Sequence, residues 1–164
     1  DSSFLIQSFE AVSSPDLFSH VLDFIPSSNC RIIEIGAGTG RDAGWLASKG
    51  LNVSAVEPVS EFREAGKSLH PSPLIEWFND SLPSLSQIIQ QKQSYQLALL
   101  ISVWQHVPKN DKIASLTNLH STPSLDTASD NVFIYTNFCV APAAIKSFIG
   151  FKDFFPFLTF CTIS

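Results

Sequence analysis

A short apolar run leads directly into a glycine-rich turn at Arg31–Arg41, and this segment restricts the fold more than any other. It reads Arg-Ile-Ile-Glu-Ile-Gly-Ala-Gly-Thr-Gly-Arg, with glycines at three alternate positions. The apolar run predicts a buried strand, and the residues after the turn predict a helix that Gly50 ends. Glycines let the backbone approach a ligand closely, and a helix N-terminus favours anionic groups. Because Glu34 also lies within the strand, the segment predicts a strand–turn–helix unit that binds a nucleotide-type cofactor.

Strand and helix patterns alternate along the rest of the chain. The expected helices span 14–25, 39–49, 60–69, 85–91, 109–120 and 142–148. The expected strands span 32–35, 51–56, 74–78, 97–103, 131–136 and 154–163. This alternation predicts a Rossmann-like α/β sandwich: a mostly parallel sheet with helices on both faces and one antiparallel edge strand. Ligands of such sheets bind at the carboxyl ends of the strands, where Glu57, Asp80 and the Val103 region are expected.

Length and charge narrow the functional class. At 164 residues the chain is long enough for one domain with its own core. Its net charge of −5 and the lack of a basic run argue against a nucleic-acid-binding surface. Cys30, Cys139 and Cys161 are widely spaced, show no metal-ligand pattern and predict reduced thiols in a cytoplasmic protein. No basic-then-apolar signal segment is visible, and because methionine is missing we expect residue 1 not to begin the reading frame.

The C-terminal end is rich in phenylalanine. Half of the 14 phenylalanines lie from Phe138 onward. Lys146, Lys152, Asp153 and two prolines interrupt this region, so no run of about 20 apolar residues remains to cross a membrane. We expect packed edge strands there, or a surface that binds a protein partner or a second copy of the chain.

A dinucleotide cofactor fits the glycine turn only in part. The dinucleotide fingerprint is Gly-x-Gly-x-x-Gly directly after a strand. Counted from Gly36 its sixth position is Arg41, so the match fails; counted from Gly38 it ends on Ala43, which fits formally but lies two residues too late. Glu57, about 20 residues downstream, suits any cofactor with a ribose diol. An NAD(P)-binding Rossmann domain therefore remains an alternative.

Four segments in order resemble class I S-adenosylmethionine-dependent methyltransferases. Glu34-Ile-Gly36-Ala37-Gly38-Thr-Gly40 resembles the first motif of that family, and Val56-Glu57-Pro58 its second acidic strand end. Asn79-Asp80-Ser81-Leu82-Pro83 is similar to the third, and Val103-Trp104-Gln105-His106-Val107-Pro108 to the segment after the fourth strand. The resemblance covers residues 29 to 119 and implies S-adenosylmethionine as cofactor and a methyl acceptor that is a small molecule.

The resemblance also implies a role for each residue. Gly36, Ala37, Gly38 and Gly40 would contact the amino-acid and ribose portions of the cofactor. Glu57, with Pro58, would bind the ribose hydroxyls, and Asp80 with the Ser81 amide would bind adenine. Glu34 and the backbone near Ser102 would hold the ammonium group, and Arg41 the carboxylate. Trp104 and His106 would lie on the substrate side, with His106 as the candidate catalytic base and no metal involved.

The chain departs from the family pattern in two places. Gln96 stands after Tyr95 where an aspartate is usual, and residues 120–130 replace the usual Pro-Gly-Gly turn. We therefore divide a single domain into an N-terminal helical segment (1–28), a cofactor-binding core (29–119) and a divergent C-terminal part (120–164). A second interpretation follows: a cofactor-binding module without catalysis that regulates a partner. The sequence does not identify the acceptor, since its determinants lie in variable loops.

Overall fold

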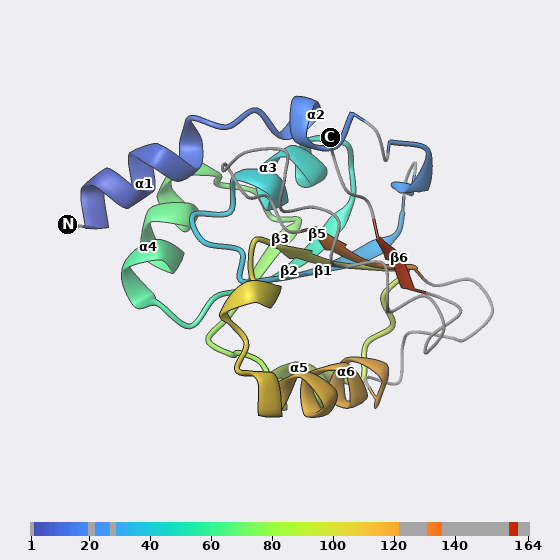
Figure 1. The fold of residues 1–164 in the computed structure, drawn as a ribbon. Helices are drawn as coiled ribbons and strands as arrows, with labels where there is room; N and C mark the ends of the chain where they lie inside the picture. Colours follow the sequence, from blue (N-terminus) through green and yellow to red (C-terminus); the bar gives the residue numbers. More distant parts are fainter. Residues whose placement is uncertain (1, 20–21, 27–28, 122–130, 136–157, 161–164) are drawn as a thin grey trace, which may run out of the picture.

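The computed structural model describes residues 2–19, 22–26, 29–121, 131–135 and 158–160, and Figure 1 shows their arrangement. One sheet forms the centre of the molecule. Its strands are β1 (Arg31–Ile35), β2 (Asn52–Val56), β3 (Ile75–Phe78), β4 (Leu97–Ile101), β5 (Asn131–Tyr135) and β6 (Leu158–Phe160). They lie in the order β3-β2-β1-β4-β5-β6, and all five pairings between described strands are parallel. The order reverses direction between β1 and β4, which is where ligands bind in such sheets.

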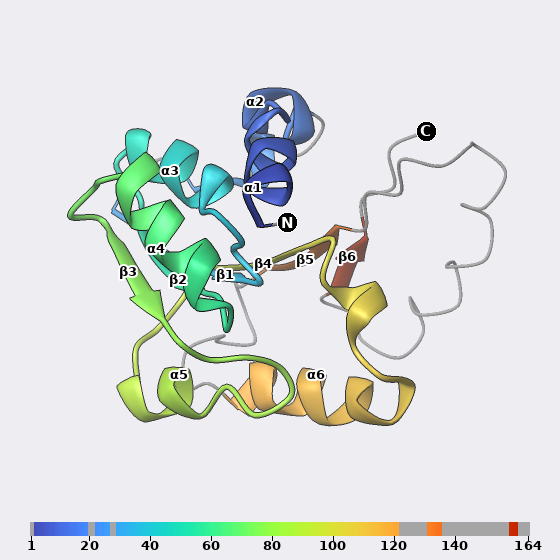
Figure 2. The same cartoon turned by 90° about the vertical axis from the view of Figure 1, so that its left-hand side faces the viewer.

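Helices cover both faces of this sheet. The α-helices are α1 (Ser2–Glu10), α2 (Ser14–Leu17), α3 (Arg41–Ser48), α4 (Ser60–Leu69), α5 (Ser86–Gln91) and α6 (Lys112–Ser121). The 3-10 turns are η1 (Leu22–Phe24), η2 (Trp104–His106) and η3 (Lys109–Asp111). Figure 2 shows α1 to α4 on one face and α5 with α6 on the other. The predicted α/β sandwich is therefore confirmed.

Alternating side chains of the central strands form two separate cores. Ile32 of β1 belongs to the core under α2 and α3, whereas Ile33 belongs to the core over α5 and α6. In β4, Leu99 and Leu100 divide between the cores in the same way. Successive side chains of a strand point to opposite faces, so a sheet covered on both faces needs nearly continuous apolar strands. That requirement explains why these strands are recognisable in the sequence.

The N-terminal region differs from the prediction. The expected continuous helix over 14–25 is wrong, because α2 ends at Leu17. Phe18 leaves the helix, is buried and stacks on Trp45 of α3 with ring centroids 5.0 Å apart. Leu22, which would extend the apolar face of a continuous helix, is exposed instead. The helix α1 lies within the N-terminal segment 1–28 that was expected to be helical, although no separate helix was predicted at its bounds.

Backbone conformation sets three further boundaries. The glycine turn extends to Gly40, whose φ of 73° is left-handed, so α3 begins at Arg41 and not at residue 39. Ser102 has a φ of 55°, which ends β4 two residues before the predicted boundary at Val103. Lys109–Asp111 forms a 3-10 turn before α6. The remaining predicted strands and helices in the described ranges agree with the structure to within a few residues.

The end of the chain is described only in part. Within the described residues, the predicted antiparallel edge strand is not found, since β6 pairs parallel with β5. A parallel pairing requires a crossover connection, and 22 residues separate the two strands in the sequence. The predicted helix over 142–148 and most of the phenylalanine-rich region lie outside the described residues. None of the helices within the described ranges combines the length and apolarity that crossing a bilayer requires.

Candidate cofactor-binding site

A cavity of about 710 Å³ lies at the carboxyl ends of β1, β2, β3 and β4. Its volume is in the range of small-molecule and cofactor sites. Most of the predicted site residues line it: Glu34, Gly36, Ala37, Gly38, Arg41, Glu57, Pro58, Asp80, Ser81, Ser102 and His106. Residues up to 72 positions apart in sequence thus meet at one edge of the sheet, because parallel strands all end there.

The glycine turn has a backbone that other residues rarely adopt. Gly36 and Gly38 have φ values of 70° and 56°. The amides of Gly36 and Ala37 both donate to the Val56 carbonyl, at 2.8 and 3.0 Å, which fixes the turn against the end of β2. A side chain on Gly36 would strike Val103, whereas one on Gly38 would only approach Phe9 at 3.4 Å. Gly36 therefore permits close packing against the segment after β4, and Gly38 keeps open the face of the turn that borders the cavity.

Glu57 connects the end of β2 to the glycine turn. It is buried, and its Oε2 accepts from the Gly38 amide at 2.9 Å. Its Oε1 accepts from the Val59 amide at 2.9 Å. A carboxylate offers about four lone-pair sites, so both oxygens keep acceptor capacity toward the cavity. The carboxylate is thereby oriented for two further donors, such as a pair of vicinal hydroxyls.

Glu34 is a buried carboxyl group without a full set of partners. Its Oε2 is buried and has no hydrogen-bond partner among the described residues. Burial raises the pKa of Glu34 well above its ordinary value, and the nearby carboxylates of Asp42 and Glu57 raise it further, although Arg41 and a hydrogen bond from the Ala43 backbone act in the opposite direction. An unpaired acceptor of this kind suits a cationic ligand, since a positive charge would favour the ionised carboxylate.

The Asp80 carboxylate accepts hydrogen bonds from three backbone amides of the protein itself. Its Oδ1 accepts from the Ser81 amide at 2.9 Å, and its Oδ2 accepts from the Gln87 and Ile88 amides at 2.7 and 3.2 Å. These last two bonds satisfy amides in the first turn of α5, whose own N-cap residue provides no side-chain acceptor. The Ser81 amide, predicted to bind adenine, is therefore already paired with Asp80.

Arg41 is engaged by the protein itself. Its Nε and Nη2 donate to the two oxygens of Asp42 at 2.9 and 2.6 Å, and its Nη1 donates to the Phe9 carbonyl at 2.9 Å. Ser14 donates to the same aspartate at 2.6 Å. That Arg41 binds the cofactor carboxylate stays a prediction; in the structure Arg41 joins α1 to α3, and Asp42, which it contacts, joins α2 to α3.

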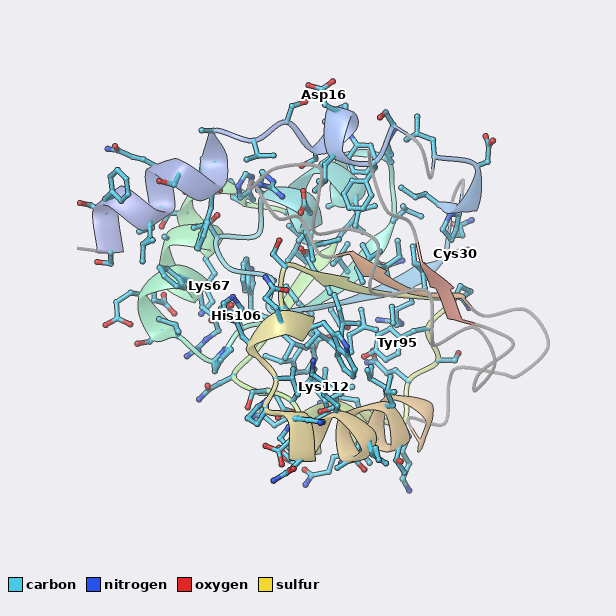
Figure 3. The ribbon with its side chains drawn as sticks, in the orientation of Figure 1. Asp16, Cys30, Lys67, Tyr95, His106 and Lys112 are labelled. Carbon is cyan, nitrogen blue, oxygen red and sulfur yellow. The ribbon has the colours of Figure 1, made fainter. Side chains whose placement is uncertain are left out.

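The segment after β4 contributes two exposed side chains to the cavity, those of His106 and Pro108. His106 is exposed and lines the cavity, and Figure 3 shows it at the edge of the sheet opposite Cys30. The Ser102 carbonyl, predicted to face the ammonium group, accepts from Gln105 Nε2 at 2.7 Å. A carbonyl has two lone pairs, so this bond leaves one acceptor position.

Two predicted site residues lie outside the cavity lining. Gly40 packs against Trp77 and provides the left-handed residue that starts α3. Trp104 is buried in the core between the sheet and α6, with Lys112 Nζ 5.3 Å from its ring centroid, so the structure does not bring it to the cavity and its assignment to the substrate side stays a prediction. Both residues support the site through packing and do not border the cavity.

One wall of the cavity, which α1 and the turn after it provide, was not predicted from the sequence. Ser8 and Phe9 of α1 line it, together with Val12 just beyond the helix. Phe9 also makes an edge-to-face contact with Phe62 of α4, with ring centroids 5.4 Å apart. The helix has no buried residue and a weak amphipathic pattern, so no local signal marks it as part of a site.

Comparison with known proteins identifies the fold. No protein-family model and no curated protein sequence matches the chain. Among solved structures, the TehB-like S-adenosylmethionine-dependent methyltransferase from Corynebacterium glutamicum superposes with a TM-score of 0.65 at 18% identity, over 81% of this chain and 71% of that one. The chain has the class I methyltransferase fold.

Two further structures share this methyltransferase fold. An S-adenosylmethionine-dependent methyltransferase from Mesorhizobium loti has a TM-score of 0.54 at 15% identity, covering 70% of this chain and 51% of that one. Phosphoethanolamine N-methyltransferase 1 from Haemonchus contortus, solved with phosphoethanolamine and S-adenosylhomocysteine, has a TM-score of 0.56 at 20% identity, over 73% and 25% of the chains. The chain thus spans about half the length, or less, of these two proteins.

Proposed function

We propose that the chain binds S-adenosylmethionine and transfers its methyl group to a small-molecule acceptor. One observation carries the proposal: Glu34, Glu57 and Asp80 line the same cavity as the open face of the glycine turn. The fold places these residues at the carboxyl ends of adjacent strands, where ligands of this architecture bind. The fold neighbours named above are methyltransferases, which supports the same reaction class.

The residues present fit this cofactor. Glu57 is held by two backbone amides with acceptor capacity left for the ribose hydroxyls. Glu34 has a buried oxygen available for the ammonium group. Asp80 keeps a remaining lone pair for the adenine amino group, although two of its three amide bonds also serve α5. The left-handed turn at Gly36–Gly38 lets the ligand lie against the backbone.

The demands on the acceptor side are modest. When bound, S-adenosylmethionine supplies a methyl group on a positively charged sulfur, which is already an activated leaving group. The chain must then hold the acceptor in line with the methyl group, and such positioning contributes on the order of 7–11 kcal/mol to lowering a barrier. If the acceptor must lose a proton, we assign its uptake to His106, whose imidazole lines the cavity.

Calorimetry separates the cofactor hypotheses. Titrating the chain with S-adenosylmethionine, S-adenosylhomocysteine and NADH tests the cofactor class directly. We expect binding of the first two, and at least a tenfold loss in Glu57→Ala, because that variant removes both ribose acceptors. Ser60→Ala, one turn away on the exposed start of α4, is the matched control. Binding of NADH alone would contradict the proposal.

Turnover separates an enzyme from a binding module. Chains that bind S-adenosylmethionine are incubated with a panel of small acceptors, and release of S-adenosylhomocysteine is measured. Binding without release across the panel would favour the module without catalysis. Once an acceptor is found, His106→Ala is expected to lower kcat by about 10²-fold or more if His106 is the base. Unchanged turnover would rule out that role.

A further inference from the structure

Arg63 joins the two strand ends that carry the proposed nucleoside-binding residues. It lies in the first turn of α4, and its side chain is half-buried. Its Nη1 donates to the Glu57 carbonyl at 2.7 Å and to the Pro58 carbonyl at 2.8 Å, both at the end of β2. The same nitrogen donates to Oδ1 of Asn79, at the end of β3, at 3.2 Å. One guanidinium nitrogen therefore bridges two neighbouring strand ends.

The bridge lies where the backbone ladder between these strands stops. The Glu57 amide donates to the Phe78 carbonyl at 3.0 Å. Among the described residues, this is the last backbone hydrogen bond between the two strand ends. Beyond it, the spacing between Glu57 and Asp80 depends on side chains, and Arg63 supplies the contact that spans the gap.

Asn79 is held on its other side as well. Its carbonyl accepts from Gln87 Nε2 at 2.7 Å. The backbone amide of Gln87 in turn donates to Asp80 Oδ2 at 2.7 Å. A continuous chain of hydrogen bonds thus runs from Arg63 on α4 to Asn79, from Asn79 to Gln87 on α5, and from Gln87 to Asp80. Because α4 and α5 cover opposite faces of the sheet, as Figure 2 shows, these hydrogen bonds connect the two helical layers around the edge of the sheet.

We propose that Arg63 is a positioning residue that sets the separation of Glu57 and Asp80 for an adenine nucleoside. This inference rests on the proposed function, since it assigns Arg63 to the same site. Ribose and adenine are rigidly connected, so the two carboxylates that bind them must be held at a fixed distance. Arg63 is absent from the cavity lining and acts through the two strand ends that it holds.

The geometry predicts which substitutions are tolerated. All three contacts come from a single nitrogen, whose two N–H groups are shared among three acceptors, whereas a lysine ammonium offers three donors from one atom. Arg63→Lys should therefore keep part of the bridge, while Arg63→Met removes the donors and keeps the apolar stem. Lys67→Met is the matched control, because Lys67 lies one turn further on α4 and its ion pair is with the exposed Glu64.

The test is calorimetry of the full chain with S-adenosylhomocysteine and with adenosine. We expect Arg63→Met to weaken both by about tenfold, which corresponds to about 1.4 kcal/mol. Arg63→Lys should bind within about threefold of the unaltered chain, and Lys67→Met should bind equally well. Rescue by lysine is not expected if Arg63 only contributes bulk, so a Lys variant as weak as the Met variant would contradict the proposal.

Asn79→Ala provides a second route if Arg63→Met does not fold. Asn79 is exposed, so its loss should not unfold the chain, yet it removes the contact of Arg63 with the end of β3. We expect a several-fold loss of adenosine affinity that is not additive with Arg63→Lys. Unchanged adenosine affinity in Asn79→Ala, or in Arg63→Met, overturns the role of Arg63 alone. Failure of the unaltered chain to bind either ligand overturns the proposed function and this inference with it.

Discussion

Two buried glutamates of the site differ in how their charges are satisfied. Glu57 accepts a backbone amide on each oxygen, whereas Glu34 Oε2 has no partner among the described residues. A buried carboxylate without partners is costly, which is why burial raises the pKa of Glu34. At the residue scale, therefore, Glu57 contributes a fixed acceptor and Glu34 contributes a charge that a cationic ligand would stabilise.

The raised pKa of Glu34 predicts how stability changes with pH. The folded chain holds this proton above the ordinary pKa of 4.5, where the unfolded chain has already lost it. The contribution to the free energy of unfolding is therefore fully present below pH 4.5 and is lost as the pH rises through the raised pKa. Urea unfolding of the chain and of Glu34→Gln, from about pH 4 to about pH 8, measures the difference.

We expect the stability of the unaltered chain to fall relative to Glu34→Gln over this range. Parallel curves for the two proteins would mean that the Glu34 charge is not penalised in the fold. Binding of S-adenosylmethionine should have the opposite pH dependence and tighten as the pH rises, because its ammonium group favours the ionised carboxylate.

Gly36 is predicted to tolerate no side chain. Alanine there would have both a left-handed φ of 70° and a collision with Val103. Gly50→Ala is the matched control, because Gly50 has a φ of 82° and nothing within 4 Å of an added Cβ. We expect Gly50→Ala to lower the free energy of unfolding by about 1 kcal/mol and Gly36→Ala by about 2–4 kcal/mol, measured by chemical denaturation. Equal losses in the free energy of unfolding would show that Val103 can move aside without destabilising the fold.

At the scale of elements, a strand or helix can be predicted when the pattern of its own residues determines it, and less well when contacts with distant segments do. β1, β2 and β4 are covered on both faces, so their apolar runs reveal them locally. The four motifs at the strand ends likewise predicted most of the cavity lining. The sequence could not reveal that Trp104 turns into the core, since an aromatic residue beside a site fits either place.

The helix α1 could not be predicted as part of the site because its contacts are all distant in sequence. Glu10 accepts from the Thr39 hydroxyl in the glycine turn and contacts His70 Nε2 at 3.0 Å. Arg41 donates to the Phe9 carbonyl at 2.9 Å. The helix itself has no buried residue, so it lacks the apolar face that usually marks a packed helix. Polar contacts across 29 to 60 residues leave no pattern in a single sequence.

Glu10 is predicted to hold α1 against the cavity. Glu10→Ala should detach the helix, because it removes the contacts with both Thr39 and His70. We expect faster amide hydrogen exchange in residues 2–10 and a loss of S-adenosylhomocysteine affinity of about three- to tenfold, with little change in global stability. Gln7→Ala, on an exposed position of the same helix, is the control. Unchanged exchange in Glu10→Ala would show that α1 is held by other contacts.

At the scale of the whole molecule, the parallel sheet explains why the site forms at all. Five parallel pairings bring the carboxyl ends of all described strands to one edge. Helices on both faces then hold that edge from two sides, through Arg63 on α4 and Gln87 on α5. A ligand at this edge touches segments from α1 to the turn after β4, so its binding should stabilise the folded chain as a unit.

Ligand-linked stability measures that coupling. S-adenosylhomocysteine at 100 times its Kd should raise the free energy of unfolding by about 2.7 kcal/mol. For a chain of this size the melting temperature should rise by about 5–10 °C. Differential scanning calorimetry measures the shift, and Glu57→Ala at the same ligand concentration should lose about half of it or more. A shift of equal size in both proteins would place the ligand away from Glu57.

A crystal structure of the full chain with S-adenosylhomocysteine tests the central claim most directly. We expect the nucleoside in the cavity at the carboxyl ends of β1, β2 and β3, with both ribose hydroxyls within hydrogen-bond distance of the Glu57 carboxylate and the amino group facing Glu34. A ligand bound outside this cavity, or one whose ribose makes no contact with Glu57, would contradict the proposed site.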